Sequence, residues 1–373
     1  MRYLLTGALV VHGAIHLLGF LKAFELAEIS ELHVPIGPGA GLVWLGAALL
    51  LLLAAGTVYL VPRLWWAPAL AGVALSQILI VGVWSDAAFG TVANAVLLVP
   101  ILLAAADLRP SSLRSIYLRE AEESLAKDVL RRGPGSGGPV TRDDLAELPA
   151  SVRTYLERAG AVGSPRVRSL RAGFRARIRG GPEESWMEGT AEQHELFQPP
   201  VRLFFMVARK AGLPVHVLHR YADGEATMEG RLLGLFRLFR ISGPKLTRSE
   251  TVTLLNDIFF LAPAVLVDLP VEWEELGERQ VRATYTNVGH TVSAVLRFDE
   301  AGDLTDFESE DRYQMDRDPP VLARWSTPFY PHREYESARL PSGGEACWGE
   351  AGKAWSYADF RLRWIRYNVP AGS

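Results

Sequence analysis

The stretch Gly41–Val61, GLVWLGAALLLLLAAGTVYLV, decides the class of this protein because it contains no charged residue. A helix of ~20 apolar residues is long enough to cross the ~30 Å hydrocarbon core of a bilayer. Three other stretches share this character, namely Tyr3–Phe20, Trp66–Trp84 and Ala87–Ala106. We therefore predict an α-helical membrane bundle of four transmembrane helices over residues 1–106.

The distribution of charge supports a boundary at this point. The chain has 373 residues with 39 basic and 42 acidic side chains, of which seven precede Asp107. Basic residues then gather directly after the fourth apolar stretch: Arg109, Arg114, Arg119, Lys127, Arg131 and Arg132. Basic residues favour the cytoplasmic side of a membrane span. We therefore predict a multi-pass protein of the bacterial inner membrane with its C-terminal domain in the cytoplasm.

Four polar side chains fall inside the predicted spans. His12 and His16 are four residues apart and share one helix face, and Gln77 and Asn94 lie in the third and fourth spans. Polar groups at membrane depth often mark a functional site, here for a metal, a quinone or a proton. The alternative is that they form hydrogen bonds between helices and only hold the bundle together. Two histidines without a third ligand do not define a metal site.

Residues 107–165 are predicted to form a helical linker. A helix from Ser111 to Arg132 carries an apolar stripe and either lies on the membrane surface or packs on the next domain. Gly133–Pro139 follows as a Gly/Pro-rich hinge. It lacks the Lys-Ser/Thr pair of a phosphate-binding loop, so we exclude nucleotide binding there.

From Arg166 onward, hydrophobic residues recur at every second position. Phe174, Ala176 and Ile178 alternate with arginines, as expected for antiparallel strands with one buried face. One helix is predicted over Ser249–Phe260. We predict that residues 166–373 form a mainly antiparallel β (α+β) domain, a curved sheet or half-barrel around this helix. Its predicted inward residues bind an apolar ligand or else fill a core: Trp186, Phe204, Phe205, Phe298 and Trp364.

No residue pattern points to a particular reaction. Glu192 and His194 share one side of a strand but lack further ligands, so no metal site is predicted. The pair Asp311-Arg312 is interpreted as structural. Cys347 is the single cysteine, which excludes an intrachain disulfide. A net charge of -3, without basic runs interleaved with aromatics, argues against nucleic-acid binding. We assign no catalytic residue and no cofactor.

Two parts of the chain resemble known families. His16-Leu-Leu-Gly-Phe20 and Trp84-Ser-Asp-Ala-Ala-Phe-Gly-Thr-Val-Ala-Asn94 look like the DoxX-like four-helix region of some bacterial proteins. Leu148–Gly160, Phe298–Arg312 and Trp348–Asn368 resemble an uncharacterised bacterial domain family of unknown function. The predicted half-barrel is also similar to lipoprotein carriers, which work outside the cytoplasm, and this leaves the periplasm as the alternative location of the domain.

These observations lead to three hypotheses. The first is a membrane-anchored binding protein whose β-rich domain holds an apolar or lipid-like molecule at the membrane surface, with membrane lipids as its partners. The second is a membrane redox or quinone-handling protein that uses the intramembrane histidines. The third is a non-catalytic scaffold that binds a protein partner through an exposed apolar patch.

Overall fold

A computed structural model describes residues 2–132, 138–336, 338–350 and 352–370. The chain divides into two compact units, Met1–Ser112 and Leu113–Ser373. The predicted hinge at Gly133–Pro139 lies mostly outside the described residues.

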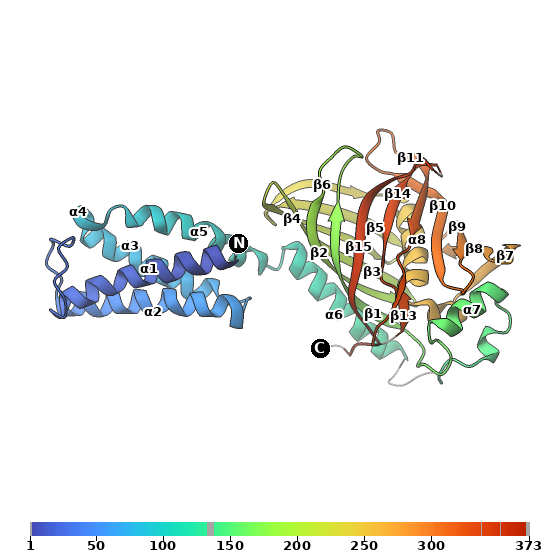
Figure 1. The fold of residues 1–373 in the computed structure, drawn as a ribbon, viewed down its shortest axis with the longest axis horizontal. Helices are drawn as coiled ribbons and strands as arrows, with labels where there is room; N and C mark the ends of the chain where they lie inside the picture. The colour runs from blue at the N-terminus through green and yellow to red at the C-terminus, as the bar shows by residue number, and fades with distance from the viewer. Residues whose placement is uncertain (1, 133–137, 337, 351, 371–373) are drawn as a thin grey trace. The chain divides into compact units, whose positions relative to one another are not determined.

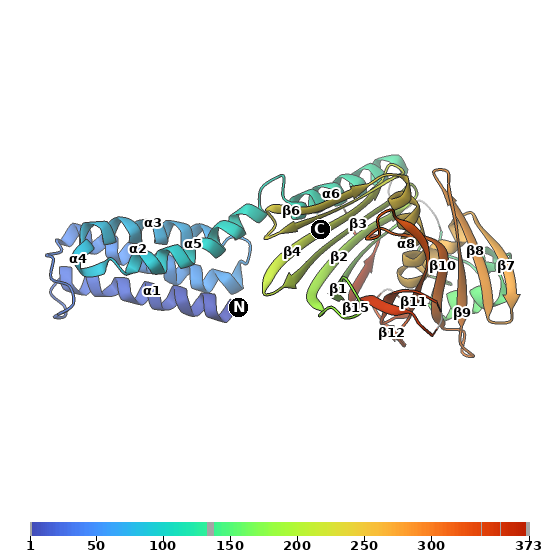
Figure 2. The same cartoon turned by 90° about the horizontal axis from the view of Figure 1, so that it is seen from above.

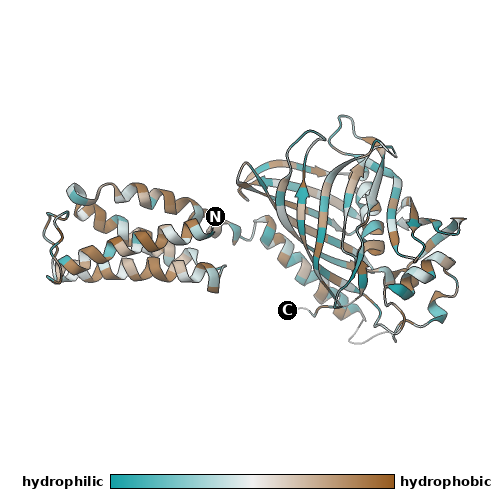
Figure 3. Cartoon of the chain, in the orientation of Figure 1, coloured by the Kyte–Doolittle hydropathy of each residue, from teal (hydrophilic) through white to brown (hydrophobic). Residues whose placement is uncertain are grey.

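The first unit is made of apolar helices (Figures 1 and 3). Its elements are α1 (Arg2–Ala23), α2 (Pro38–Leu60), α3 (Trp66–Gly82), the short α4 (Trp84–Ala87) and α5 (Gly90–Asp107). By length and composition α1, α2 and α5 could each cross a membrane. With 17 residues, α3 rises about 26 Å and is shorter than a typical span. The predicted third span, Trp66–Trp84, is thus shorter than expected because the helix is interrupted at Val83 before α4.

The second unit contains an antiparallel sheet of 13 strands, in agreement with the mainly antiparallel β (α+β) domain that was predicted. Its order is β6-β5-β4-β3-β2-β1-β15-β14-β11-β10-β9-β8-β7. One half is built by β1 (Ser169–Ile178), β2 (Met187–Phe197), β3 (Pro200–Lys210), β4 (Leu213–Ala222), β5 (Glu225–Leu232) and β6 (Phe236–Ser242). The other half is built by β7 (Val271–Gly277), β8 (Gln280–Asn287), β9 (His290–Phe298), β10 (Leu304–Gln314), β11 (Val321–Pro328) and β14 (Gly343–Trp348). The last strand, β15 (Trp355–Tyr367), pairs with β1 and joins the halves.

The sheet curves into a half-barrel around the helix α8 (Pro244–Leu261), as Figure 2 shows. The helix begins five residues earlier than predicted, because Gly243 adopts a φ of 106° and Pro244 occupies the first helical turn. At its C-terminal end Phe259 packs against Trp273 and Phe307. The hydroxyl of Tyr155 in α7 (Ala150–Arg158) donates a 2.6 Å hydrogen bond to the carbonyl of Phe259. This end of the half-barrel is therefore a filled core.

Outside the half-barrel, α6 (Leu113–Arg132) covers part of the convex face of the sheet (Figure 2). Tyr117 of this helix stacks on Phe205 of β3 with ring centroids 5.8 Å apart. Leu113, Leu203 and Leu218 complete the apolar contact. Of the two predicted positions for this helix, the structure shows packing on the sheet. Small elements complete the unit: η1 (Asp143–Leu145), η2 (Pro263–Asp268), β12 (His332–Glu334) and β13 (Arg339–Pro341).

Candidate functional site: a cavity inside the half-barrel

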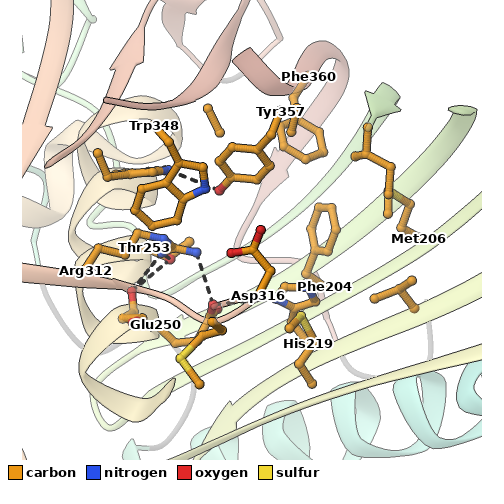
Figure 4. A pocket seen from close by; sticks show the side chains of 18 of the residues that line it. Phe204, Met206, His219, Glu250, Thr253, Arg312, Asp316, Trp348, Tyr357 and Phe360 are labelled. Carbon is orange, nitrogen blue, oxygen red and sulfur yellow. Dashed lines mark hydrogen bonds and ion pairs between the residues drawn. The ribbon is translucent and has the colours of Figure 1, made fainter. Parts of the chain in front are cut away.

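A cavity of about 520 Å³ lies between the concave face of the sheet and α8. Apolar side chains from seven strands and the helix make up most of its wall: Phe174, Phe204, Met206, Val217, Met228, Phe260, Trp325, Trp348 and Phe360. Figure 4 shows several of them converging on the space in front of α8. The volume falls within the ~300–1,000 Å³ range of pockets that hold small organic ligands.

Buried charges form one side of this cavity. Arg202 of β3 is surrounded by carboxylates, with Asp257 at 2.6 Å, Glu250 at 3.1 Å and Glu195 at 3.4 Å. A second guanidinium, that of Arg312, lies 3.5 Å from Glu250. We call these five residues the acid–arginine cluster. All five are at least nine-tenths buried, so their charges have been removed from water and must compensate one another.

The net charge of the acid–arginine cluster depends on the protonation of its carboxyl groups. Two arginines face three carboxyl groups, so full ionisation would leave one negative charge in excess. Burial, followed by the charge of Asp257, raises the pKa of Glu195 well above its usual range. Burial also acts to raise the pKa of Glu250, but His219, Arg202 and Arg312 together hold it well below the usual range. The raised pKa favours the protonated form of Glu195, which reduces the excess of negative charge in the cluster.

Three polar atoms in the cavity wall have no hydrogen-bond partner within the described part of the chain. They are the side-chain oxygen of Asn256, an acceptor on α8, the Nε of Arg312, a donor on β10, and the hydroxyl of Thr327 on β11. The Arg312 guanidinium lies 4.7 Å from the centre of the Trp325 ring and 6.0 Å from that of Trp348. In Figure 4 it lies between Trp348 and Glu250. A buried polar atom without a partner is costly, so these atoms offer binding sites to a ligand.

The period of each element explains how these residues meet. On β2, Gln193 and Glu195 point to the concave face, and Gln193 donates hydrogen bonds of 2.8 Å to Glu195 and 2.9 Å to Asp257. His194 between them points outward, with its Nε2 3.3 Å from Ser124 of α6. On α8, the residues that line the cavity recur at helical spacing: Ser249, Glu250, Thr253, Asn256 and Asp257.

Among the five aromatic residues predicted to face inward, Phe204 lines the cavity. Phe205 follows it on the same strand and therefore points to the opposite face, under α6. Phe298 packs on Tyr155 in the filled core, with ring centroids 5.7 Å apart. The remaining two lie on the periphery: Trp186 contacts the guanidinium of Arg179 at 4.5 Å, and Trp364 is 40% exposed.

The structure connects three of the four predicted intramembrane polar residues. Nε2 of His12 donates a 2.8 Å hydrogen bond to the side-chain oxygen of Asn94, which also accepts one of 3.0 Å from Ser76. The amide nitrogen of Asn94 donates to Gln77 at 3.1 Å. Nδ1 of His16 donates to the carbonyl of His12 at 2.9 Å. Nε2 of His16 must then carry a lone pair, and within the described residues this buried atom has no partner.

The sequence interpretation missed most of the acid–arginine cluster. It interpreted Arg312 as the structural partner of Asp311, whereas Asp311 binds Arg248 and Arg312 faces Glu250. It did not single out Glu195, Arg202, Glu250 or Asp257. Their signal in the sequence is weak but present: Glu250 and Asp257 are acidic residues among the apolar residues of helix α8, and Arg202 interrupts an apolar strand. Buried charges of this kind require partners. Among the described residues, no group of three or more His, Cys, Asp or Glu side chains is placed to hold a metal ion.

The chain was compared with family models, curated proteins and solved structures. The model of a family of unknown function, DUF6544, matches residues 138–360. A comparison with curated proteins finds no match. Among solved structures, a domain from Vibrio parahaemolyticus described as an outer membrane lipoprotein-sorting protein is 13% identical, with 54% of this chain and 86% of that chain covered and a TM-score of 0.33. A LolA superfamily protein from Nitrosomonas europaea is 8% identical, with 58% and 94% covered and a TM-score of 0.32.

Proposed function

This chain belongs to a family of unknown function (DUF6544), and we propose that its half-barrel binds an amphiphilic, lipid-like molecule beside the membrane in which its helices are anchored. The observation that carries the proposal is the cavity itself, because it combines a wide apolar wall with unpartnered polar atoms on one side. A filled core would leave no such space. The proposal assigns no reaction to the protein.

The polar side of the cavity limits the chemistry of the ligand. Asn256 offers an acceptor and Arg312 a donor, so a hydroxyl or an amide with an N–H, each of which both donates and accepts, would satisfy both atoms. The guanidinium charges are already compensated by carboxylates within the cluster. We therefore propose a ligand with an uncharged polar group and an apolar body of one or more alkyl chains.

Anchoring is proposed for the whole helical unit. The spans α1, α2 and α5 are long and apolar enough to cross a bilayer, and we propose that α3 crosses as the fourth, extended by α4. The basic residues after α5 support a cytoplasmic half-barrel. In this organisation residues 1–106 anchor the chain in the membrane, residues 107–165 connect the anchor to the β-rich domain, and residues 166–373 bind the ligand. The resemblance of the helical region to DoxX-like proteins remains a prediction.

The experiment fills the cavity and leaves the rest of the sheet unchanged. Met206→Trp places an indole in the cavity wall, while Thr190→Trp adds the same side chain at an exposed position of neighbouring β2. The full chain is purified in detergent, and its lipids are extracted and measured by mass spectrometry. We expect a stoichiometric species in the unaltered protein and in Thr190→Trp, and its loss in Met206→Trp.

The same measurement can refute the proposal. Lipids bound around the membrane helices will be present in all three proteins and serve as the internal background. If no species is depleted by Met206→Trp while its melting temperature stays near that of the unaltered protein, the half-barrel does not bind a lipid in this cavity.

A second candidate function belongs to the helical unit. The hydrogen-bonded chain His12–Asn94–Gln77 and the unpartnered Nε2 of His16 favour a polar ligand inside the bundle, such as a quinol whose hydroxyl would donate to that nitrogen. This hypothesis predicts a quinone that copurifies with the protein and is lost in His16→Ala. His33→Ala, at an exposed histidine, is the matched control. Equal quinone content in both variants would eliminate this candidate.

A further inference from the structure

The two edges of the half-barrel differ in charge. The edge strand β7 carries Glu272, Glu274 and Glu275 and no basic residue. The opposite edge strand, β6, has the sequence Phe236-Arg-Leu-Phe-Arg-Ile-Ser242 and no acidic residue. An open sheet therefore ends in one acidic edge and one edge that is basic and apolar.

The side chains of β6 are exposed on both faces of the strand. Phe236 is 63% exposed and Leu238 is 54% exposed, although large apolar side chains normally avoid water. Arg237 and Arg240 on the same strand are also exposed, and both share the carboxylate of Glu229 at 3.2 and 3.8 Å. Because Glu229 additionally binds Arg231 at 2.8 Å, the edge keeps an excess of positive charge.

A neighbouring turn extends this surface. The turn between β3 and β4 carries the exposed residues Arg209, Lys210 and Leu213. It lies beside the β5–β6 turn, because the backbone nitrogen of Leu233 donates a 2.7 Å hydrogen bond to the carbonyl of Pro214. We call the combined surface the β6 rim and define it as Arg209, Lys210, Leu213, Phe236, Arg237, Leu238 and Arg240.

The β6 rim coincides with one end of the cavity. Lys210 and Leu238 are exposed residues of the rim and also line the cavity, as does Phe239 between the arginines of β6. Residues that are both exposed and part of the lining mark a place where the cavity reaches the surface. A body that contacts the rim would therefore lie next to the cavity mouth.

We propose that the β6 rim docks on the surface of a bilayer that contains anionic phospholipid. Four cationic side chains match the negative headgroups, and each basic residue near such a surface typically strengthens binding about fivefold. Phe236, Leu238 and Leu213 are placed to enter the interface, where aromatic and aliphatic side chains favour shallow insertion. The docking itself stands independently, while the passage of a lipid from bilayer to cavity rests on the proposed binding function.

The test places a photo-reactive amino acid at the rim. The full chain, with p-benzoylphenylalanine at position 236, is reconstituted in vesicles of phosphatidylcholine with or without phosphatidylglycerol. The control carries the same group at position 288, in the turn after β8, where Val288 is 64% exposed. We expect lipid adducts at position 236 in vesicles with phosphatidylglycerol, a clear reduction without it, and background levels at position 288.

Charge removal gives a second measurement. Arg237→Gln with Arg240→Gln should weaken docking roughly 25-fold and lower the adduct yield, without a change in melting temperature because both side chains are exposed. Equal adduct yields at positions 236 and 288, or a yield independent of phosphatidylglycerol, would overturn the proposal. A cross-link from position 236 to a second copy of the chain would also overturn it, in favour of pairing between the basic and acidic edges. The lipid content of Met206→Trp is measured separately, so failure of docking is distinguishable from failure of ligand binding.

Discussion

Replacing Arg202 with methionine would remove the cation at the centre of the acid–arginine cluster. Arg202 contacts Glu195, Glu250 and Asp257 at 3.4, 3.1 and 2.6 Å. Glu250 would keep Arg312 at 3.5 Å, whereas Asp257 would lose the cation at 2.6 Å and keep the neutral amide of Gln193. Removing one partner of a buried ion pair typically lowers the free energy of unfolding by ~3–5 kcal/mol. At ~2–4 °C per kcal/mol for a domain of this size class, the melting temperature should fall by roughly 6–20 °C.

Glu195→Gln is the matched change within the same cluster. Because burial and Asp257 raise the pKa of Glu195 well above its usual range, folding favours the protonated side chain, and an amide of the same shape replaces that form. The expected loss is about 1 kcal/mol or less. The raised pKa also fixes the sign of the pH dependence. The contribution of Glu195 is complete below its unfolded pKa of about 4.5 and is lost as pH rises toward the folded value. The stability of Glu195→Gln relative to the unaltered protein should therefore rise from about pH 5 upward.

The assay is thermal unfolding of the full chain in detergent, followed by tryptophan fluorescence. Arg279→Met serves as the surface control, because Arg279 forms an exposed pair with Glu300 at 3.4 Å and such pairs contribute about 0–1 kcal/mol. If Glu195→Gln melts as low as Arg202→Met, the proton assignment in the cluster is wrong. If Arg202→Met melts within about 2 °C of the control, the cluster does not stabilise the half-barrel.

Three further predictions concern the sheet and its packing, and thermal unfolding checks each of them. Tyr155→Phe removes the donor to the carbonyl of Phe259 and should cost about 1–3 kcal/mol, with an unchanged melting temperature arguing against that bond. Burial and then Glu308 raise the pKa of Asp306 to about 6. Asp306→Asn should therefore stabilise the protein above pH 6 by at most about 3 kcal/mol, with no gain near pH 4. A gain in stability that is equal at both pH values would contradict this prediction. Gly189→Ala would place a Cβ 2.4 Å from the carbonyl oxygen of Val207 and should lower the melting temperature by several degrees, whereas Thr190→Ala beside it should not.

The apolar spans and the antiparallel strands were predictable because each depends on a local period. Continuous apolar stretches gave the helices α1, α2 and α5, and alternation gave most of the strands. Alternation alone does not say which face of a strand is concave. Phe204 and Phe205 were both predicted to face inward, yet neighbours on a strand point to opposite faces, and the curvature of the sheet decides that Phe204 lines the cavity.

The polar cluster could not be predicted in the same way. Arg202 and Glu250 are 48 residues apart, and Arg312 and Glu250 are 62 apart. No local period relates such positions, and they meet only because α8 crosses the concave face of the sheet. The same holds in the helical unit, where His12 and Asn94 are 82 residues apart. The residue types were recognised there, but the hydrogen-bond partners depend on how the helices pack.

The pairing of β15 with β1 has a consequence for how the half-barrel forms. The backbone nitrogen of Arg168 binds the side chain of Asn368, 200 residues later, and the strands between them complete the centre of the sheet. The chain therefore makes two meanders, β1–β6 and β7–β11, that are joined only when the last strand arrives. During synthesis, the edge strand β1 of the first meander stays unpaired on one side until β15 has been made. Such long-range pairing slows folding. A chain shortened before Trp355 would release two separate sheets, each with an unpaired edge open to aggregation.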